Sequence, residues 1–190
     1  MMLSRLKTSL AARPGKRIEG GAQTTQAAVA VVIRPNLDVL FIRRAVHEGD
    51  PWSGHMALPG GRRDPSDPSL DAVARRETRE EVGVDLRAAI RLGRLDDLAS
   101  PGRTPRMVVS PFVYTLDADP QVTIDPAEVA AHYWFNLQRL VDGEGRSTFR
   151  YTHEGRPLDL PCVDLDGQRI WGITLGIVDD LVGRLSAKSG

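Results

Sequence analysis

One helix constrains the fold of this chain more than any other feature, because its two ends need different surroundings. The helix is predicted between Asp67, which can cap it, and Gly83, which can end it, and Pro68 suits its first position. Its apolar residues recur at spacings of three and four, which indicates a helix face that packs on a core. These residues are Leu70, Val73 and Ala74.

Three carboxylates continue this face towards the end of the helix. Glu77, Glu80 and Glu81 follow at helical spacing, which predicts that they lie at the edge of the core. Neighbouring carboxylates repel each other by a few kcal/mol at about 4 Å in a protein-like dielectric, so the cluster should take up protons or bind a cation. Mg²⁺ or Mn²⁺ suits such oxygen ligands. The alternative is a solvated helix face with an ordinary Arg76–Glu80 ion pair.

The turn before the helix favours the cation-binding interpretation. In "LPGGRRDP", Gly60 and Gly61 allow the backbone to approach a ligand closely, so their carbonyls and amides become available to a metal ion or a phosphate. Arg62 and Arg63 add positive charge at the same bend. The turn and the helix together therefore predict one site for a cation and an anion.

The turn and the segment "RETREEVGV", from Arg76 to Val84, resemble the signature of the Nudix hydrolases, a family that cleaves a nucleoside diphosphate linked to another group. The family pattern is Gly, five residues, Glu, seven residues, then Arg-Glu-apolar-any-Glu-Glu-any-Gly-apolar. In this chain Thr78 replaces the first apolar residue, Asp67 replaces the first Glu, and the gap to Arg76 is one residue longer. The resemblance covers residues 27–185. It implies an α/β (α+β) fold of the Nudix type, an α/β/α sandwich with a central mixed sheet.

The resemblance also implies roles for individual residues. The implied metal ligands are Glu77, Glu80, Glu81 and a carbonyl of Gly60 or Gly61. Arg76 would hold the first glutamates in place through ion pairs. The proton acceptor for water would be Glu81 or another box glutamate, or a carboxylate from a distal loop, for which Glu128 and Glu144 are the candidates. An ordinary surface position is the alternative for each of these two loop glutamates.

Within the family, the subgroup that acts on coenzyme A is most similar to this chain. The resemblance rests on "LFIRRA", "GHMALPGGRRDPSD" and "RIWGITLGIV". Of the subgroup's upstream motif the chain supplies Arg44, Ala45, Gly54 and "LPGG". Ile42 replaces the motif's Thr, and Gly49-Asp50 stands where its second Arg is expected. The resemblance implies hydrolysis of coenzyme A or its thioesters with Mg²⁺ or Mn²⁺, giving an adenosine bisphosphate and a phosphopantetheine product.

Two other functions remain open from the sequence. The first is the same chemistry on another nucleoside diphosphate derivative, such as a nucleotide sugar, ADP-ribose or a nucleotide. The second is a nucleotide-sensing module without catalysis, although the intact carboxylate set argues against it. The residues expected to contact the substrate are Arg44, Arg62, Arg63, Arg103, Arg106 and Trp52. The arginines would bind phosphate and the indole would stack on a base, whereas solvated loop side chains are the alternative for Arg103 and Arg106.

Composition limits the partners of the chain. Its 190 residues predict one domain over residues 25–190, preceded by a basic arm or helix over residues 1–24. In that arm four apolar residues favour an amphipathic helix over a targeting segment: Met2, Leu3, Leu6 and Leu10. The 25 basic and 25 acidic residues balance, so neither nucleic acid nor a membrane is expected as a partner. The single Cys162 excludes an internal disulfide and fits a cytoplasmic protein. A homodimer is compatible with the sequence.

The remaining elements follow from short apolar runs and turn residues. Strands are expected over residues 27–33, 38–44, 55–58, 90–98, 107–116 and 132–137, with a further pair around 148–164. A last amphipathic helix is expected over residues 170–185. The long Gly- and Pro-rich segment between residues 45 and 69 is expected to carry function.

Overall fold

The computed structural model describes residues 2–19, 21, 24–50, 52–100, 107–153 and 156–186, apart from the side chain of His153. The helices are α1 (Met2–Ala12), α2 (Leu70–Val82), α3 (Leu137–Val141) and α4 (Gly172–Ser186). The strands are β1 (Thr25–Ile33), β2 (Asp38–Arg44), β3 (Met56–Ala57), β4 (Gly60–Arg62), β5 (Ile90–Arg94), β6 (Leu98–Ala99), β7 (Met107–Thr115), β8 (Val129–Asn136), β9 (Arg146–His153), β10 (Arg156–Leu165) and β11 (Gln168–Trp171).

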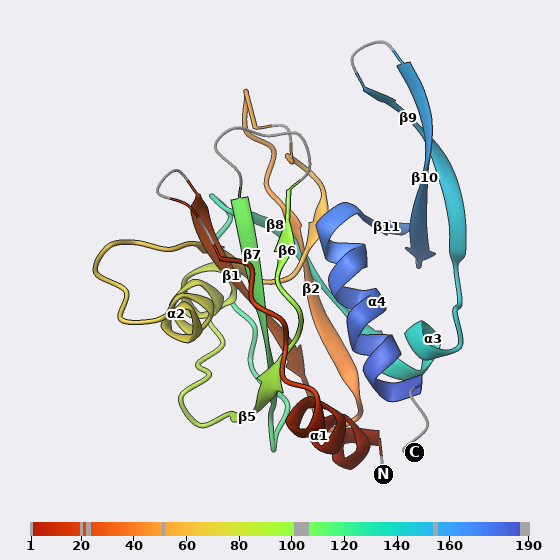
Figure 1. The fold of residues 1–190 in the computed structure, drawn as a ribbon. Helices are drawn as coiled ribbons and strands as arrows, with labels where there is room; N and C mark the ends of the chain where they lie inside the picture. The colour runs from red at the N-terminus through yellow and green to blue at the C-terminus, as the bar shows by residue number, and fades with distance from the viewer. Residues whose placement is uncertain are drawn as a thin grey trace.

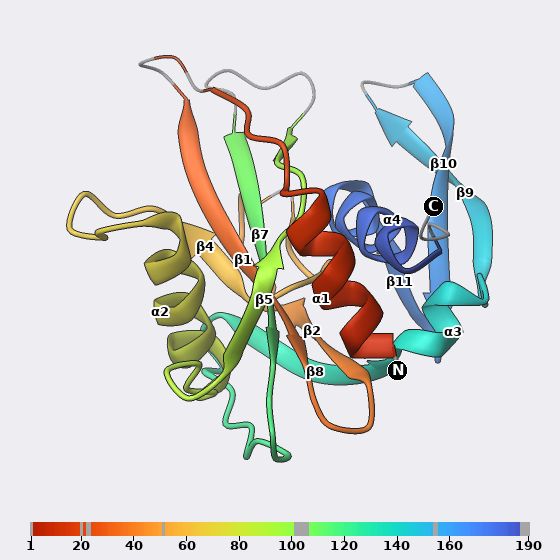
Figure 2. The ribbon, with the colours of Figure 1, turned by 60° about the horizontal axis from the view of Figure 1, so that its bottom comes forward.

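A mixed sheet of eight strands forms the centre of the molecule. Its main path is β3-β2-β1-β7-β5, with β4 beside β1, β6 beside β7 and β8 beside β2. The β1–β7 pair is parallel and the other pairs are antiparallel. Helix α2 covers one face, and α1 and α4 cover the other (Figures 1 and 2). The expected α/β/α sandwich with a central mixed sheet is confirmed.

The two faces of β1 explain why the sheet is covered on both sides. Alternate residues point to opposite faces of a strand. Ala28, Ala30 and Val32 therefore pack towards α2, whereas Val31 and Ile33 pack towards α1 and α4. This run of small and β-branched residues has no polar face, as is expected of a strand in the middle of a sheet that is buried on both sides.

A second sheet stands beside α4. It has three antiparallel strands in the order β11-β10-β9, and the β9–β10 hairpin extends away from the central sheet (Figure 1). Val163, Leu165 and Ile170 bury their side chains against the core that α4 shares. The sheet thus ends in a strand, β11, that leads directly into α4.

Most expected elements are present. Strand β4 and helix α3 are additional to them, and four further corrections apply. The strand expected over residues 90–98 is two strands, because Leu95 bonds to Pro111 and Asp97 to Lys16 outside any ladder. The strand expected at residues 132–137 begins at Val129. Strand β11 was not expected, and the last helix begins two residues later than predicted because Ile170 and Trp171 pair with β10.

Helix α1 is present as expected and packs on the body of the protein. Leu6 and Leu10 are buried in the same core cluster as α4. Beyond the helix, the amides of Lys16 and Ile18 donate to Asp96 and Asp97 at 2.9 Å each. The division of the chain at residue 24 stays a prediction. In the part of the chain that the structure describes, no helix is long and apolar enough to cross a membrane.

Candidate active site

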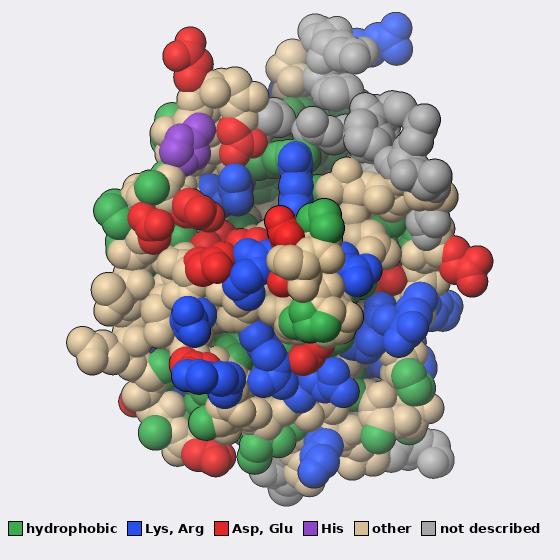
Figure 3. All heavy atoms as spheres, turned by 90° about the vertical axis from the view of Figure 1, so that its left-hand side faces the viewer, with side chains coloured by type: hydrophobic (Ala, Val, Ile, Leu, Met, Phe, Trp, Pro, Cys, Tyr) green, Lys and Arg blue, Asp and Glu red, His purple; other side chains and the backbone are tan. Residues whose placement is uncertain are grey.

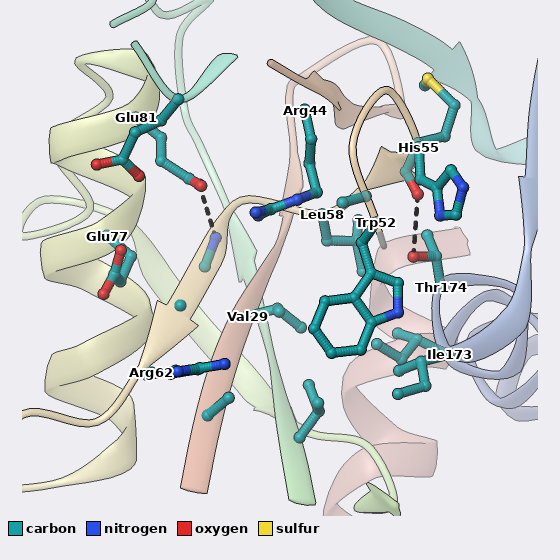
Figure 4. A pocket seen from close by; sticks show the side chains of 18 of the residues that line it. Val29, Arg44, Trp52, His55, Leu58, Arg62, Glu77, Glu81, Ile173 and Thr174 are labelled. Atoms are coloured by element: carbon teal, nitrogen blue, oxygen red, sulfur yellow. Dashed lines mark hydrogen bonds between the residues drawn. The ribbon is translucent and has the colours of Figure 1, made fainter. Parts of the chain in front are cut away.

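A split in the central sheet creates a cavity between its strands. β1 pairs with β2 only at Ile33 and Val39, and its first half pairs with β4 instead. The segment that carries β3 and β4 bridges the gap, since the Ala30 amide donates to the Pro59 carbonyl at 2.8 Å. A cavity of about 600 Å³ lies along this split, between α2 and α4 (Figure 4). Residues from both faces of the sheet therefore reach one space.

Glu81 is the most buried carboxylate of the cavity. It is 2% exposed, and its Oε2 accepts a hydrogen bond from the Gly60 amide at 2.8 Å. Burial raises the pKa of Glu81 to about 8, the charges of Glu77 and Glu128 add to the rise, and the Gly60 hydrogen bond opposes it. Below pH 8 and without a cation, this side chain is therefore mostly protonated.

Glu77 faces the same cavity one turn earlier on α2 (Figure 4). Its carboxylate lies so close to Gly61 that a Cβ on residue 61 would stand 2.4 Å from the Glu77 Cδ. Burial raises the pKa of Glu77, and the Arg76 guanidinium partly offsets the rise. Gly61 is thus needed because it leaves space for the Glu77 carboxylate. Its amide hydrogen-bonds neither Glu77 nor Glu81 in this structure.

Arg76 connects the carboxylates of this region. Its guanidinium contacts Asp67 at 2.9 Å, Glu77 at 2.9 Å and Glu80 at 2.7 Å. Contrary to the sequence prediction, Asp67 does not cap α2. The N-cap is Ser69, whose hydroxyl accepts a hydrogen bond from the Ala72 amide at 3.1 Å. The Arg76 hydrogen bond lowers the pKa of Asp67, whose side chain is 6% exposed. Asp67 therefore braces Arg76 between the turn and the helix.

The chemistry of this donor set fits a divalent cation. Glu77 and Glu81 are largely buried, face one cavity and both have raised pKa values, so negative charge there is only partly compensated. As the side chains stand among the described residues, no three His, Cys, Asp or Glu side chains are grouped closely enough to hold a metal ion. The Arg76 guanidinium now lies between Glu77 and Glu80, where it supplies the positive charge.

Arg44, the last residue of β2, brings a cation to the opposite wall of the cavity (Figure 4). Its Nη2 donates to Asp50 at 2.9 Å, while its buried Nε has no hydrogen-bond partner among the described residues. Asp50 uses its other oxygen to accept the Trp52 amide at 3.0 Å. One carboxylate thus fixes both the guanidinium and the turn that brings the Trp52 side chain into the cavity.

The structure brings together some of the predicted residues and separates others. Those that line the cavity are Arg44, Trp52, Gly60, Gly61, Arg62, Arg76, Glu77, Glu80, Glu81 and Glu128. Arg63 points away and donates to Gln26 at 2.9 Å. Glu144 does not line the cavity. Its carboxylate pairs with Arg139 at 2.7 Å on the surface, so Glu144 is withdrawn as a candidate proton acceptor. Arg103 and Arg106 lie outside the described residues.

Sequence reasoning did not identify the end of the cavity that lies next to α4. It is lined by Trp171, Ile173, Thr174 and Ile177, for which the sequence predicts only an amphipathic helix over residues 170–185. An apolar stripe at helical spacing has the same pattern whether it faces a core or a cavity, so the sequence held no signal to separate the two. Asp50 was also missed as a partner of Arg44.

The face of the molecule that carries α2 shows no field of one charge. On the side of the molecule that carries α2, acidic and basic side chains are interspersed (Figure 3). Arg75 pairs with Asp71 at 2.8 Å, and Arg87 pairs with Asp85 at 2.5 Å.

Comparisons with known proteins agree with this geometry. Residues 24–153 match the sequence model of the NUDIX domain. An uncharacterised protein of Schizosaccharomyces pombe is 42% identical over 108 residues, which are 54% of this chain and 33% of the yeast protein. The chain therefore spans about one third of the length of that relative. The uncharacterised Nudix hydrolase NudL of Photorhabdus laumondii is 27% identical over 168 residues, 88% of each chain.

Solved structures share the fold. A MutT NUDIX hydrolase from Burkholderia pseudomallei matches with a TM-score of 0.55 and 21% identity over 83% of this chain and 98% of its own. An Ap4A hydrolase from C. elegans matches with a TM-score of 0.51 and 20% identity over 62% of this chain and 84% of its own. At these identities the likeness concerns the arrangement of helices and strands.

Proposed function

Because this chain belongs to the Nudix hydrolase family, we propose that its cavity hydrolyses the diphosphate bond of coenzyme A or of a coenzyme A thioester. Family membership makes it a diphosphatase of nucleoside diphosphate derivatives, which are small molecules. The products would be an adenosine bisphosphate and a phosphopantetheine. The proposal rests above all on the buried Glu81, which shares its cavity with Glu77 and with the unpaired Nε of Arg44.

Nudix hydrolases generally use divalent metal ions, and we propose Mg²⁺ or Mn²⁺ for this chain. The proposed ligands are Glu77, Glu80, Glu81 and a carbonyl of Gly60 or Gly61. When bound, the metal supplies positive charge to the diphosphate oxygens and lowers the pKa of a bound water. Arg76 would then hold Glu77 and Glu80 in position, braced by Asp67.

The proposed proton acceptor is Glu81. Its Oε2 already accepts the Gly60 amide, so Oε1 is the oxygen that would take the proton from water. Burial raises the pKa of Glu81, so its carboxylate, once ionised beside a bound cation, is a stronger base than an exposed glutamate. Glu128, in the turn before β8, lines the same cavity and is the second candidate.

The proposed phosphate contacts come from Arg44 and Arg62. Both side chains line the cavity, and a guanidinium can donate two hydrogen bonds to phosphate oxygens. The unpaired Nε of Arg44 would find its partner in such an oxygen. Trp52 would stack on a flat group of the substrate.

The choice of coenzyme A rests on the sequence motif around the cavity. Arg44 and the Gly60-Gly61 pair belong to that motif and line the cavity, and Gly54 lies in the intervening loop. At the position of the motif's second arginine this chain has Asp50, which pairs with Arg44. This substitution reduces the positive charge at that wall, so the relative rates on substrates with and without an extra phosphate become the informative measurement.

The test is a product analysis with Mg²⁺ or Mn²⁺. The purified protein is incubated with coenzyme A, dephospho-coenzyme A, ADP-ribose and a nucleotide sugar, and the products are identified by mass spectrometry. Phosphopantetheine release from coenzyme A is expected. Cleavage of ADP-ribose or the sugar nucleotide without phosphopantetheine release would overturn the coenzyme A assignment, and no cleavage of any substrate would overturn catalysis by this cavity.

A further inference from the structure

The cavity has two unlike ends that come from different parts of the chain (Figure 4). The charged side chains that line it all belong to residues 44–128. The opposite end is closed by Trp171 of β11 and by Ile173, Thr174 and Ile177 of α4. These residues follow the segment 24–153 that matches the NUDIX domain. The family domain therefore supplies the charged end, and a segment outside it supplies the other.

The polar groups at the α4 end are already engaged or uncharged. The Thr174 hydroxyl donates to the Met56 carbonyl at 3.2 Å (Figure 4). The His55 ring stands edge-on to Trp171, with 4.9 Å between the ring centroids, and burial lowers the pKa of His55, which favours the neutral imidazole. A hydroxyl-rich group placed here would lose its water without gaining equivalent partners.

The wall at this end is also preformed. Trp171 contacts two further rings of the three-stranded sheet, with centroid distances of 5.3 Å to Phe149 and 5.1 Å to Tyr151. Across the cavity, Val29 and Val109 present apolar side chains from the central sheet. An apolar space that needs no rearrangement gains affinity from any apolar group that fills it.

We propose that residues 171–177 form a subsite for an uncharged aliphatic group linked to the diphosphate, and that this subsite selects against sugars. The inference rests on the proposed hydrolysis of a diphosphate at the carboxylate end of the same cavity. Ile173 is the residue that determines the selection, because its partly exposed side chain faces this space (Figure 4). A cavity of about 600 Å³ has room for a diphosphate together with such a group.

The test uses esters of ADP with methanol, butanol and hexanol, which differ only in the length of the aliphatic group, and ADP-ribose as the sugar counterpart. Cleavage gives AMP and an alkyl phosphate. For the unaltered protein, kcat/KM should rise about two- to fourfold for each methylene added until the subsite is filled. ADP-ribose should be cleaved less efficiently than the hexyl ester, by about tenfold or more.

Ile173→Asn should remove most of the dependence on chain length, so that kcat/KM falls much more for the hexyl ester than for the methyl ester. Ile173→Val should weaken the dependence in the same direction without risk to folding, which thermal unfolding checks for both variants. Ile90→Asn is the matched control, because Ile90 is 47% exposed on β5 and does not line the cavity.

The possible failures are distinguishable. Equal rates for the methyl ester, the hexyl ester and ADP-ribose would overturn the subsite while diphosphate hydrolysis stands, as would an Ile173→Asn variant that slows all substrates equally. If no ester is cleaved, and coenzyme A is not cleaved either, the proposed function fails and the subsite with it.

Discussion

Two groups of charged side chains in this protein differ in how far positive and negative charges are paired. The paired group has a structural role, and the incompletely paired group lies in the candidate active site. Around Arg184, whose side chain is 2% exposed, the guanidinium contacts Asp180 at 2.9 Å and Asp96 at 2.7 Å, and Arg13 contacts Asp180 at 2.9 Å. Two arginines thus meet two aspartates. In the cavity, the equally buried Glu81 has one amide as its hydrogen-bond donor and two further carboxylates nearby.

Balanced buried charge holds elements together, because each desolvated ion has its partner. The Arg184 group joins α1, α4 and the segment between β5 and β6. Unbalanced buried carboxylates cost stability unless a proton or a cation joins them. The carboxylates of the cavity carry this cost, which supports the proposed cation site.

The largest expected effect comes from removing the charge of Glu81. Glu81→Gln should lower kcat on the diphosphate substrate by about 10²–10⁴-fold, because the amide cannot take a proton from water. The free energy of unfolding should stay equal or rise, since the neutral side chain can still accept the Gly60 amide. Steady-state kinetics and urea unfolding measure both. A kcat within tenfold of the unaltered protein would assign the proton to another group, with Glu128 next in order.

The converse experiment breaks the balanced group. Arg184→Met should lower the free energy of unfolding by about 3 kcal/mol, because it leaves two aspartates without their buried partner. At temperatures where the variant is folded, kcat should not change. The matched control is the exposed pair between Arg146 of β9 and Asp179 of α4, with 42% and 46% of the side chains exposed. Arg146→Met should cost less than about 1 kcal/mol, and an equal cost for both variants would contradict the comparison.

The pH dependence of metal binding sharpens the comparison further. Folding raises the pKa of Glu81 to about 8, so the protonated form stabilises the metal-free protein at low pH, and this contribution is lost as the pH rises towards 8. Metal binding requires the ionised form. Affinity for Mn²⁺ should therefore increase with pH up to about 8, by at most about tenfold per unit. Calorimetry from pH 6 to 9 measures it, and Glu81→Gln should flatten the curve.

The smallest expected effect concerns the ion pair at the cavity wall. Asp50→Asn keeps an acceptor for the Trp52 amide and removes the negative charge beside Arg44. The KM for the diphosphate substrate should fall by about two- to fivefold, the size of a partly exposed ion pair, with kcat nearly unchanged. Asp85→Asn is the control, because that carboxylate pairs with Arg87 at the surface. A rise in KM would mean that Asp50 serves mainly to position Arg44.

The sequence predicts the parts of this site that depend on local order. Helix α2 and its carboxylates follow from residue spacing, and Gly83 ends the helix in a left-handed conformation with φ 71° as expected. Asp67 and Ser69 both belong to residue types that cap helices. The position at which the backbone turns into the helix decides which of them is the cap. Arg62 and Arg63 could have been separated by the alternation of a strand, had β4 been identified.

Tertiary arrangement decides the rest. Glu128 and Glu144 are both loop glutamates, yet the first lines the cavity and the second is bound to Arg139. Nothing in their local sequence distinguishes them, because the distance to α2 is set by how the strands pair. The same holds for Trp171 and Ile173, which reach the cavity only because β11 packs next to β3.

The close approach of Gly61 to Glu77 links the substitutions that are possible at two positions sixteen residues apart. A side chain at residue 61 would occupy the space of the carboxylate, so residue 61 cannot gain one while Glu77 keeps its place. Among relatives of this chain, a lineage that gains a side chain at the first position should also have lost the acid at the second. Such paired changes would mark the branches that have given up this chemistry.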